Sequence, residues 1–538
     1  MFGLENADLL VVAAYLVAVT WLGLRAARGV KTSAEYFMPR RFGRWALALS
    51  AFSTATSAEQ AVTVASKCYS TGASGIWYQW QYLFTTPFYW IVAPLLRRLR
   101  AITTADIFEA RFDRSVALLY CGVGLLKSTC TLGLMLKGTS TLLAATTAGA
   151  VHGDALIVVL TVVFVGYSFL GGWSASVITN VFQGLLTLLF SFMLVPFVWV
   201  AVGGMGGMKE TLAHAPAMFS LVTPGDVSLF TIVILAIGSL VGLPGIPHNL
   251  GIATASRREQ DGQFGFTVGA FIKRLCTAAW CLTGLAGAAY FVAAPINPDE
   301  VYGRLAQAFL PQLLPGLLGV FIAATLAEVM GTCSSMMNSA AALVTHNLYR
   351  HFRPDRPDRH YLLVGRVASV LVVASGVAFA FWLPGVVKGL EIVIAIGPLM
   401  GVAFWLGVFW RRTTVGGAWA ATVTGLVALL VCERAGVSVG VQLAAILGSA
   451  TVAGVLASLF TAPVPEAKLD NFLALMNTPV APGERVDAPC TLPAGVVADG
   501  AKRRWRFPMD RRAWWGFAAC WAAVLAMILG LWIMLRLG

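Results

Sequence analysis

Ionisable and hydroxyl side chains stand inside long apolar stretches of this sequence. Glu328, Thr332 and Ser335 are spaced i, i+4 and i+7 within the apolar run 314–347, so a helix there places a carboxylate and two hydroxyls on one face. Oxygens grouped in this way can hold a proton or a hard cation such as sodium. Ionisable residues at membrane depth are usually functional, whereas the structural alternative is a Glu paired with a nearby Lys or neutral in a packed interface.

Two further runs carry residues that interrupt a helix. The run 45–69 has a central polar block, and the run 227–251 has Gly and Pro within its second half; the residues are Ser53, Thr54, Thr56, Ser57, Glu59, Gln60, Gly238, Gly242, Pro244, Gly245, Pro247 and His248. Unwound backbone is tolerated in a bilayer only where it is buried in protein or lines a watery cavity. The two breaks therefore predict a binding site at the membrane midplane.

Cations also occur inside apolar runs, at Lys67, Lys127 and Lys137. Burying each of them unpaired costs several kcal/mol, so each needs a partner or water. If they line the pathway, they favour a carboxylate-bearing substrate. If they pair with Glu59 or Glu328, or extend to the interface, they are structural.

The elements that hold these residues are membrane helices. Hydrophobic residues make up 58% of the chain and charged ones 12%, and the mean hydropathy is +0.77, which excludes an ordinary soluble domain. The apolar runs are continuous and long enough to cross a bilayer, which takes about 20 helical residues, whereas a β-barrel has shorter, alternating segments. We predict about fourteen spans, near 7–25, 45–69, 74–95, 116–148, 153–172, 175–203, 227–251, 266–294, 314–347, 361–384, 387–410, 414–435, 438–463 and 512–536.

The formal charge of +13 follows from basic residues at one membrane face. Arg and Lys gather in the odd-numbered loops, as after the first, third, seventh, ninth and eleventh spans, which predicts cytoplasmic odd loops and both termini outside. This distribution argues against nucleic acid as the partner. The first run lacks the flanks of a signal peptide and is expected to be a retained span.

The two breaks divide the chain into an internal repeat. Each opens a run of five spans, and because five is odd the second copy enters from the opposite side of the membrane. The expected organisation is an N-terminal extra helix and loop at 1–44, a first repeat at 45–203, a second, inverted repeat at 227–410, two additional helices at 411–463, a cytoplasmic linker at 464–511 and a last span at 512–538.

Several segments resemble the sodium/solute symporter family, which includes sodium/proline, sodium/sialic acid and sodium/glucose symporters. They occur in the order of that family and cover most of the chain: SAEQ at 57–60, YQW at 78–80, TTADIFEARF at 103–112, GGWSASVITNVFQ at 171–183, PGIPHNL at 244–250, SSMMNSAAALVTHNLYR at 334–350 and LGVFWRRTTVGGAWAATVTG at 406–425. The resemblance implies an all-α integral membrane protein with the LeuT-type 5+5 inverted-repeat fold.

The resemblance also implies a sodium site between the first break and the ninth span. The first break would supply backbone oxygens of Ser53 and Thr56, and the ninth span has Glu328, Gly331 and Thr332 where the family has a small residue and two adjacent hydroxyl residues. An Asp that the family carries after Thr179 is Asn180 here. We therefore hypothesise that Glu328 replaces the missing acid, as a charged sodium ligand or as a proton site, with Ser335 on the same face. Asn347, where the family has Asp, is a departure whose role the sequence leaves open.

Candidate substrate residues come from the breaks and the helix after the first break. Gln60 and Gln79 match positions that contact sugar in the galactose-transporting relative, although the counterpart of Gln79 is Glu there. Tyr78 could stack on a solute, and Lys67, Lys137 and His248 complete the candidates. His248 follows Pro247 as in proline-type members, but a satisfied polar group at a helix break explains it equally well.

The function expected from the resemblance is symport. A small organic solute such as a carboxylate, amino acid or sugar would cross the cell membrane with sodium, which is the coupling ion; no organic cofactor is expected. The alternatives are proton coupling through Glu328 and a membrane solute sensor that has lost transport, which the altered hydroxyl pair and Asn180 would fit. Neither a GxxxxGK[ST] loop nor a nucleophile motif stands out, so we expect neither a primary pump nor an enzyme.

Overall fold

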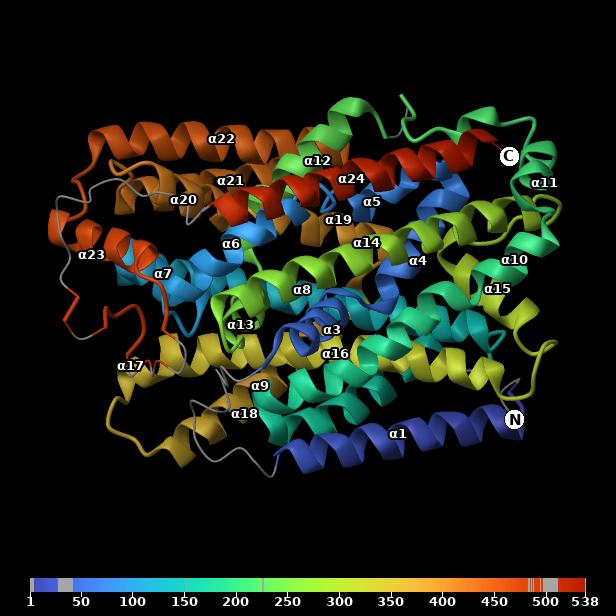
Figure 1. Ribbon diagram of the computed structural model, residues 1–538, viewed down its shortest axis with the longest axis horizontal. Coiled ribbons are helices and arrows are strands. Elements are labelled where there is room, and N and C mark those ends of the chain that lie inside the picture. The colour runs from blue at the N-terminus through green and yellow to red at the C-terminus, as the bar shows by residue number, and fades with distance from the viewer. Residues whose placement is uncertain are drawn as a thin grey trace.

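The computed structural model describes residues 4–27, 42–150, 152–224, 227–481, 484, 486, 488–493, 495–496 and 511–537, and for residues 24, 26–27, 160, 163–164, 167–175, 247–248, 252 and 537 it describes the backbone alone. Throughout these ranges the regular structure is helical (Figure 1). The helices are α1 Asn6–Ala27, α3 Arg44–Ala55, α4 Ala58–Thr71, α5 Trp77–Trp80, α6 Thr86–Arg98, α7 Thr104–Arg111, α8 Arg114–Thr146, α9 Gly153–Met193, α10 Val195–Ala201, α11 Gly204–Thr211, α12 Leu229–Val241, α13 Pro247–Thr254, α14 Glu259–Tyr290, α15 Val301–Phe309, α16 Leu317–Ala342, α17 Arg350–Phe352, α18 Asp358–Trp382, α19 Val386–Ile396, α20 Pro398–Phe409, α21 Val415–Ala435, α22 Val439–Phe460, α23 Glu466–Asn477 and α24 Arg511–Leu537. Short 3-10 turns are η1 Gly72–Ile76, η2 Pro216–Phe219, η3 Leu243–Gly245 and η4 Pro298–Glu300, and η5 Leu343–Tyr349 is a π-helical turn.

Ten helices within the described ranges are long and apolar enough to cross a membrane, so the predicted count of fourteen is not confirmed. The difference has a physical origin, because a helix interrupted at mid-depth yields two pieces that are each too short. The first core helix is divided into α3 and α4, and α12 has 13 residues. The sequence also predicts separate spans at 153–172 and 175–203, but α9 runs without interruption from Gly153 to Met193 through this boundary. The boundary that the sequence predicted between residues 172 and 175 is therefore wrong.

Both predicted helix breaks are present. Between α3 and α4, Thr56 (φ −120°, ψ 128°) and Ser57 (φ −147°, ψ 157°) are extended. After α12 the chain forms η3, and Ile246 is extended (φ −104°, ψ 101°) before α13 begins. Ile246 precedes Pro247, and a residue before proline is sterically driven out of the helical region.

Most of the core helices fall into two groups. The first helix group is α3, α4, α6, α13 and α14, in which α14 packs against the other four; the second helix group is α8, α9, α16 and α18, in which α16 and α18 pack against α8 and α9. The groups meet where α3 touches α9 and α16, and where α4 touches α8. The first break therefore lies at the interface between the groups.

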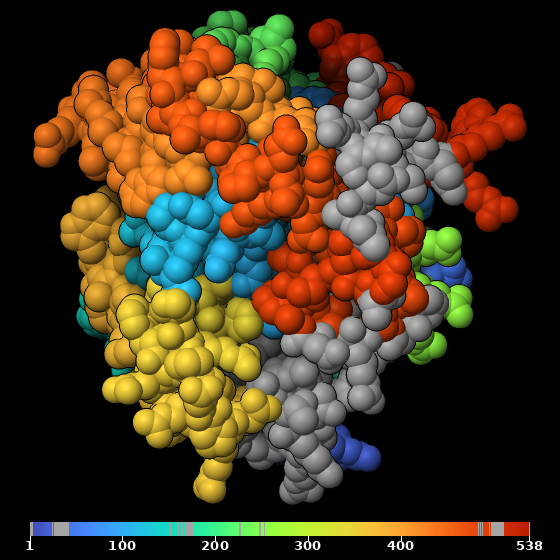
Figure 2. Space-filling view, turned by 90° about the vertical axis from the view of Figure 1, so that its left-hand side faces the viewer, coloured from blue at the N-terminus to red at the C-terminus, as the bar shows by residue number. Residues whose placement is uncertain are grey.

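The chain termini lie at one end of the long axis, and α7, α17 and α23 lie at the other (Figure 1). This agrees with two termini on the same membrane side, while the side itself stays a prediction. Figure 2 looks onto the end opposite the termini, where α7 in cyan is flanked by α23 in orange-red and by the yellow segment that includes α17.

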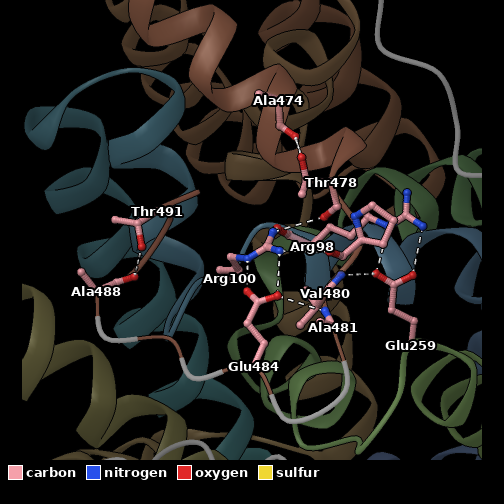
Figure 3. A network of polar contacts seen from close by, with 11 residues as sticks. Arg98, Arg100, Glu259, Ala474, Thr478, Val480, Ala481, Glu484, Ala488 and Thr491 are labelled. Carbon is pink, nitrogen blue, oxygen red and sulfur yellow. Dashed lines mark hydrogen bonds and ion pairs between the residues drawn. The ribbon is translucent and has the colours of Figure 1, made fainter. Parts of the chain in front are cut away.

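The predicted linker 464–511 contains structure that its composition did not indicate. It begins with α23, which packs against α6 and α7. Residues 478–481 and Glu484, called the strap below, then lie against the end of α6. Arg100 donates to the carbonyl oxygens of Thr478 (3.2 Å) and Pro479 (3.1 Å) and pairs with Glu484 at 2.6 Å (Figure 3).

A second ion pair holds the same strap. Glu259, at the start of α14, accepts from Nε and Nη2 of Arg98, each at 3.0 Å, and from the backbone N–H of Val480 at 3.1 Å (Figure 3). Bidentate Arg–carboxylate pairs are geometrically specific. The strap is therefore fixed to the first helix group at two points.

Candidate functional site

Carbonyl oxygens released by the first break meet a hydroxyl from α16. The hydroxyl of Thr332 lies 3.1 Å from the oxygen of Ser53 and 2.9 Å from that of Thr56, and 3.2 Å from the carbonyl of Glu328 in its own helix. Thr332 is 1% exposed. Since Thr56 is extended, its carbonyl no longer joins the α3 ladder and is free to accept from α16. The structure thus brings together three residues that the sequence placed at one cation site.

A pocket of oxygens surrounds Gly331. A methyl group added to Gly331 would lie 2.8 Å from Oε1 of Gln183, 3.0 Å from Oγ of Ser53 and 3.1 Å from Oδ1 of Asn180. All three oxygens are buried and have no hydrogen-bond partner among the described residues. Buried polar atoms are almost always satisfied, so three unpartnered oxygens around one point make it a candidate position for a bound cation or an ordered water. We call these residues, with Thr332, the oxygen cluster; its donors are of the kind that hard cations prefer.

The amide of Asn180 is held in place by Thr54 and by Ser335, which the sequence also placed at the cation site. Its Nδ2 donates to Oγ1 of Thr54 at 2.9 Å and to Oγ of Ser335 at 3.2 Å, which leaves Oδ1 aimed elsewhere. Ser335 in turn donates to the carbonyl of Gly331 at 3.1 Å. Gln183 was missed by the sequence analysis, although it stands three residues after Asn180 on the same helix and so on the same face.

Glu328 lies on α16 one turn before Thr332 and is completely buried. Neither carboxylate oxygen has a hydrogen-bond partner, and no ion pair within 4.0 Å involves it among the described residues. Glu59 and Lys273 are the charged groups close enough to act on it electrostatically. A buried carboxylate without a partner is costly, and a bound cation or a proton removes that cost.

A cavity of about 110 Å³ lies beside the oxygen cluster, between the two helix groups. Thr54, Ala55 and Thr332 belong to its wall, so the cavity and the break share residues. Of the predicted substrate residues, Gln60 and Gln79 line it, and the Oε1 atom of each is buried without a partner. The remaining polar wall, apart from two tyrosines, consists of Glu59, Lys127, Thr131, Asn249, Lys273 and Arg274.

Three predicted substrate residues do not line this cavity. The hydroxyl of Tyr78 bonds Glu391 at 3.2 Å, and the ammonium of Lys67 lies 4.7 Å from the centre of the Tyr78 ring. Lys137 is half-buried on α8, away from the cavity wall. The side chain of His248 lies outside the described part of the chain.

The second break is closed by contacts from neighbouring elements. Asn249 donates to the carbonyl of Leu243 at 3.2 Å, and the hydroxyl of Tyr120 donates to that of Pro244 at 3.1 Å. A methyl group on Gly245 would lie 2.4 Å from the carbonyl oxygen of Gly397, so only glycine permits this approach.

Asn347 takes no part in the cavity. It accepts from the hydroxyl of Thr103 and donates to Asp106, both at 2.6 Å, and so fixes η5 to the start of α7. An Asp at this position could not donate to Asp106. The departure that the sequence left open is explained by this contact.

The comparisons with known proteins all find sodium-coupled symporters. The profile of the Sodium:solute symporter family matches residues 36–425. The sodium/glucose cotransporter of Vibrio parahaemolyticus is 26% identical over 77% of this chain and 83% of its own length, and the sodium/pantothenate symporter of Escherichia coli (strain K12) is 26% identical over 78% and 88%. A Na+-coupled sialic acid symporter in a substrate-bound, outward-open state superposes with a TM-score of 0.75 at 20% identity, covering 86% of this chain and 99% of that one.

Proposed function

This chain belongs to the sodium:solute symporter family, and from that premise we propose that it carries one small polar organic solute across the membrane together with sodium, through a site between its two helix groups. The single observation that supports this most is the adjacency of the oxygen cluster and the cavity. Thr332 contacts the carbonyls of Ser53 and Thr56 and also lines the cavity. An ion bound at the cluster would therefore change the wall that a solute meets.

In this proposal sodium is coordinated by backbone oxygens of Ser53 and Thr56, by Thr332, and by the orphaned oxygens of Asn180 and Gln183 above Gly331. Glu328 supplies the negative charge next to this set, and Ser335 orients Asn180. The donors are uncharged oxygens, which suit a hard monovalent ion. Among the described residues no group of three or more His, Cys, Asp or Glu side chains could hold a transition metal.

The proposed solute site is the cavity, with Gln60 and Gln79 as its hydrogen-bonding amides. Tyr78, Lys67 and Lys137 are left outside it. Sodium at the oxygen cluster would hold α3 and α16 in one arrangement, favouring the conformation that binds solute. Solute bound between the groups would then permit them to rock together and open toward the other membrane face.

Uptake into proteoliposomes tests the proposal. Purified protein is reconstituted, and solutes are presented under an inward sodium gradient, with an equal potassium gradient as the ionic control. Sodium-dependent accumulation of a solute is the expected result. Absence of accumulation under both sodium and proton gradients would end the symport proposal and would favour a solute sensor.

The buried, unpartnered carboxylate of Glu328 favours one alternative, which is proton coupling. A Glu328→Gln variant separates the two possibilities, because the amide keeps the shape and removes both the charge and the titration. Under sodium coupling the variant should need about tenfold more sodium, which corresponds to about 1.4 kcal/mol of lost interaction. Under proton coupling it should lose uptake driven by a pH gradient.

A matched control for this variant is Glu391→Gln, since Glu391 lies on α19, bonds Tyr78 and is outside the oxygen cluster. The control should keep wild-type coupling to both ions. Wild-type coupling in Glu328→Gln itself would remove this residue from the mechanism.

A further inference from the structure

The cavity wall carries an excess of positive charge. Lys127 comes from α8, and Lys273 and Arg274 come from α14, whereas Glu59 is the acid among the described residues that line it. The three cations are 5%, 5% and 2% exposed. Charges this deeply buried in a membrane protein mark an ion or substrate path unless they are paired.

None of the three cations forms an ion pair within 4.0 Å among the described residues. Lys127 reaches the carbonyl of Val393 only at 3.5 Å, and Lys273 donates to the carbonyl of Ala55. Arg274 donates to the carbonyl of Gln79 at 3.1 Å, but its Nε atom has no partner. Neutral carbonyls compensate a buried charge less well than a carboxylate does. The wall therefore carries more positive charge than its own carboxylate, that of Glu59, compensates.

The cations face the cavity from opposite helix groups. Lys127 belongs to the second group, whereas Lys273 and Arg274 belong to the first. An anion between them would contact both groups at once, and it would draw them together because each group presents it with positive charge.

The size of the cavity restricts that anion. An engineered protein cavity of about 150 Å³ accommodates benzene, which has six carbon atoms. At about 110 Å³, this cavity suits a solute of about six non-hydrogen atoms or fewer by the same measure, which is smaller than a sugar or pantothenate.

We propose that the solute is a short-chain monocarboxylate whose carboxylate is held between Lys127 and the Lys273–Arg274 pair. The proposal rests on the proposed function and narrows its substrate. Three cations stand against one carboxylate in the wall, that of Glu59, while the charge of Glu328 beside the wall is matched by the sodium ion of the proposed function, so the wall keeps a net positive charge that an anion offsets. Gln60 and Gln79 line the cavity beside the bound acid.

Two measurements on the wild-type protein test the substrate class. Thermal stabilisation in detergent with sodium reports binding, and sodium-driven proteoliposome uptake reports transport. Acetate, propionate and pyruvate should stabilise the protein and accumulate, whereas acetamide, which matches acetate in size without its charge, should do neither. Glucose, proline and pantothenate serve as larger alternatives.

The outcomes separate the two proposals. Uptake of a neutral or larger solute without any carboxylate response would overturn the substrate class and leave symport intact. Carboxylate stabilisation without uptake of anything would support the binding site and overturn transport. No response to any solute in either measurement would overturn both.

Variants of α8 locate the site. Lys127→Met should raise the half-saturating acetate or propionate concentration at least tenfold, because it removes one of the cations that bind the carboxylate, and Lys127→Arg should stay within a few-fold of wild type. Lys137→Met is the matched control, since it makes the same change on the same helix outside the cavity, and it should leave the value unchanged. An equal loss in both Met variants would contradict the assignment; if Lys127→Met does not fold, the response of Lys127→Arg and the wild-type selectivity decide.

Discussion

At the scale of single residues, the candidate ion site consists of oxygens rather than charges. The hydroxyl of Thr332 is the one side-chain group of α16 that touches both carbonyls of the first break. A ligand set of this kind leaves little trace in a sequence, because backbone oxygens belong to every residue. Its position becomes visible only through the break that frees the carbonyls.

Replacing Thr332 by Val tests this hydroxyl. The substitution keeps the branched shape and removes one oxygen, so the sodium concentration for half-maximal uptake should rise about tenfold, the equivalent of about 1.4 kcal/mol. Thr325→Val is the control, because Thr325 is buried on the same helix and bonds only the carbonyl of Phe321 in its own helix. Equal sodium dependence in the two variants would show that Thr332 is no ligand.

At this scale the spacing of Glu328, Thr332 and Ser335 was sufficient to place them on one face of a helix, and Gln60 and Gln79, which line the cavity, were named from motifs. That these residues bind an ion or a solute stays a prediction. The sequence did not indicate which cations line the cavity. Whether Lys127 or Lys137 lines the cavity depends on which face of α8 meets α4 and α19, and spacing along one helix does not contain that information.

At the scale of elements, the second break depends on a close approach of two backbones. Gly245 in η3 lies against Gly397 between α19 and α20, and an added methyl group would meet a carbonyl oxygen at 2.4 Å. The sequence predicted this break from its Gly and Pro residues, but it gave no indication of the partner, because Gly397 is distant in the chain.

A Gly245→Ala variant should therefore lose stability by about 1–3 kcal/mol, the usual cost of overpacking, with a lower melting temperature in detergent. Gly448→Ala is the control, since Gly448 is exposed on α22 and a methyl group there meets nothing within 4 Å. A melting temperature for Gly245→Ala as high as that of the control would mean that the two backbones are farther apart than described.

The strap is the element that composition concealed. Its prolines suggested a free linker, yet Glu484 pairs with Arg100, which is buried at 1% exposure (Figure 3). The charged partners lie hundreds of residues apart, so a scan along the chain could not associate them.

Glu484→Gln should release the strap, because a bidentate charged pair with a buried guanidinium becomes a single neutral contact. Hydrogen exchange of the amides of Thr478, Val480 and Ala481 should become faster, whereas Glu466→Gln, which changes an exposed carboxylate at the start of α23, should leave it unaltered. Unchanged exchange in Glu484→Gln would show that the pair does not hold the strap.

At the scale of the whole molecule, the sequence predicted the fold class and the helix breaks better than it predicted the number of membrane spans. The all-helical fold and both breaks were confirmed, because composition and helix-breaking residues determine them locally. The number of spans was not confirmed, because hydropathy along the sequence does not distinguish one interrupted helix from two short ones. For the same reason it does not show that α9 is continuous where the sequence predicted a boundary.

The shared wall of the oxygen cluster and the cavity makes a prediction about the molecule as one unit. Thr332 and the first break belong to both sites, so sodium and solute each favour the same arrangement of the two helix groups. Linkage then requires that sodium raise the affinity for solute by the same factor by which solute raises the affinity for sodium, a factor of about 5–150 for typical coupling energies. Titrating the purified protein calorimetrically with each ligand at several fixed concentrations of the other measures both factors, with potassium as the control ion. Equal factors above one are expected; a solute affinity independent of sodium would mean that the two sites, although adjacent, do not act on a common conformational equilibrium.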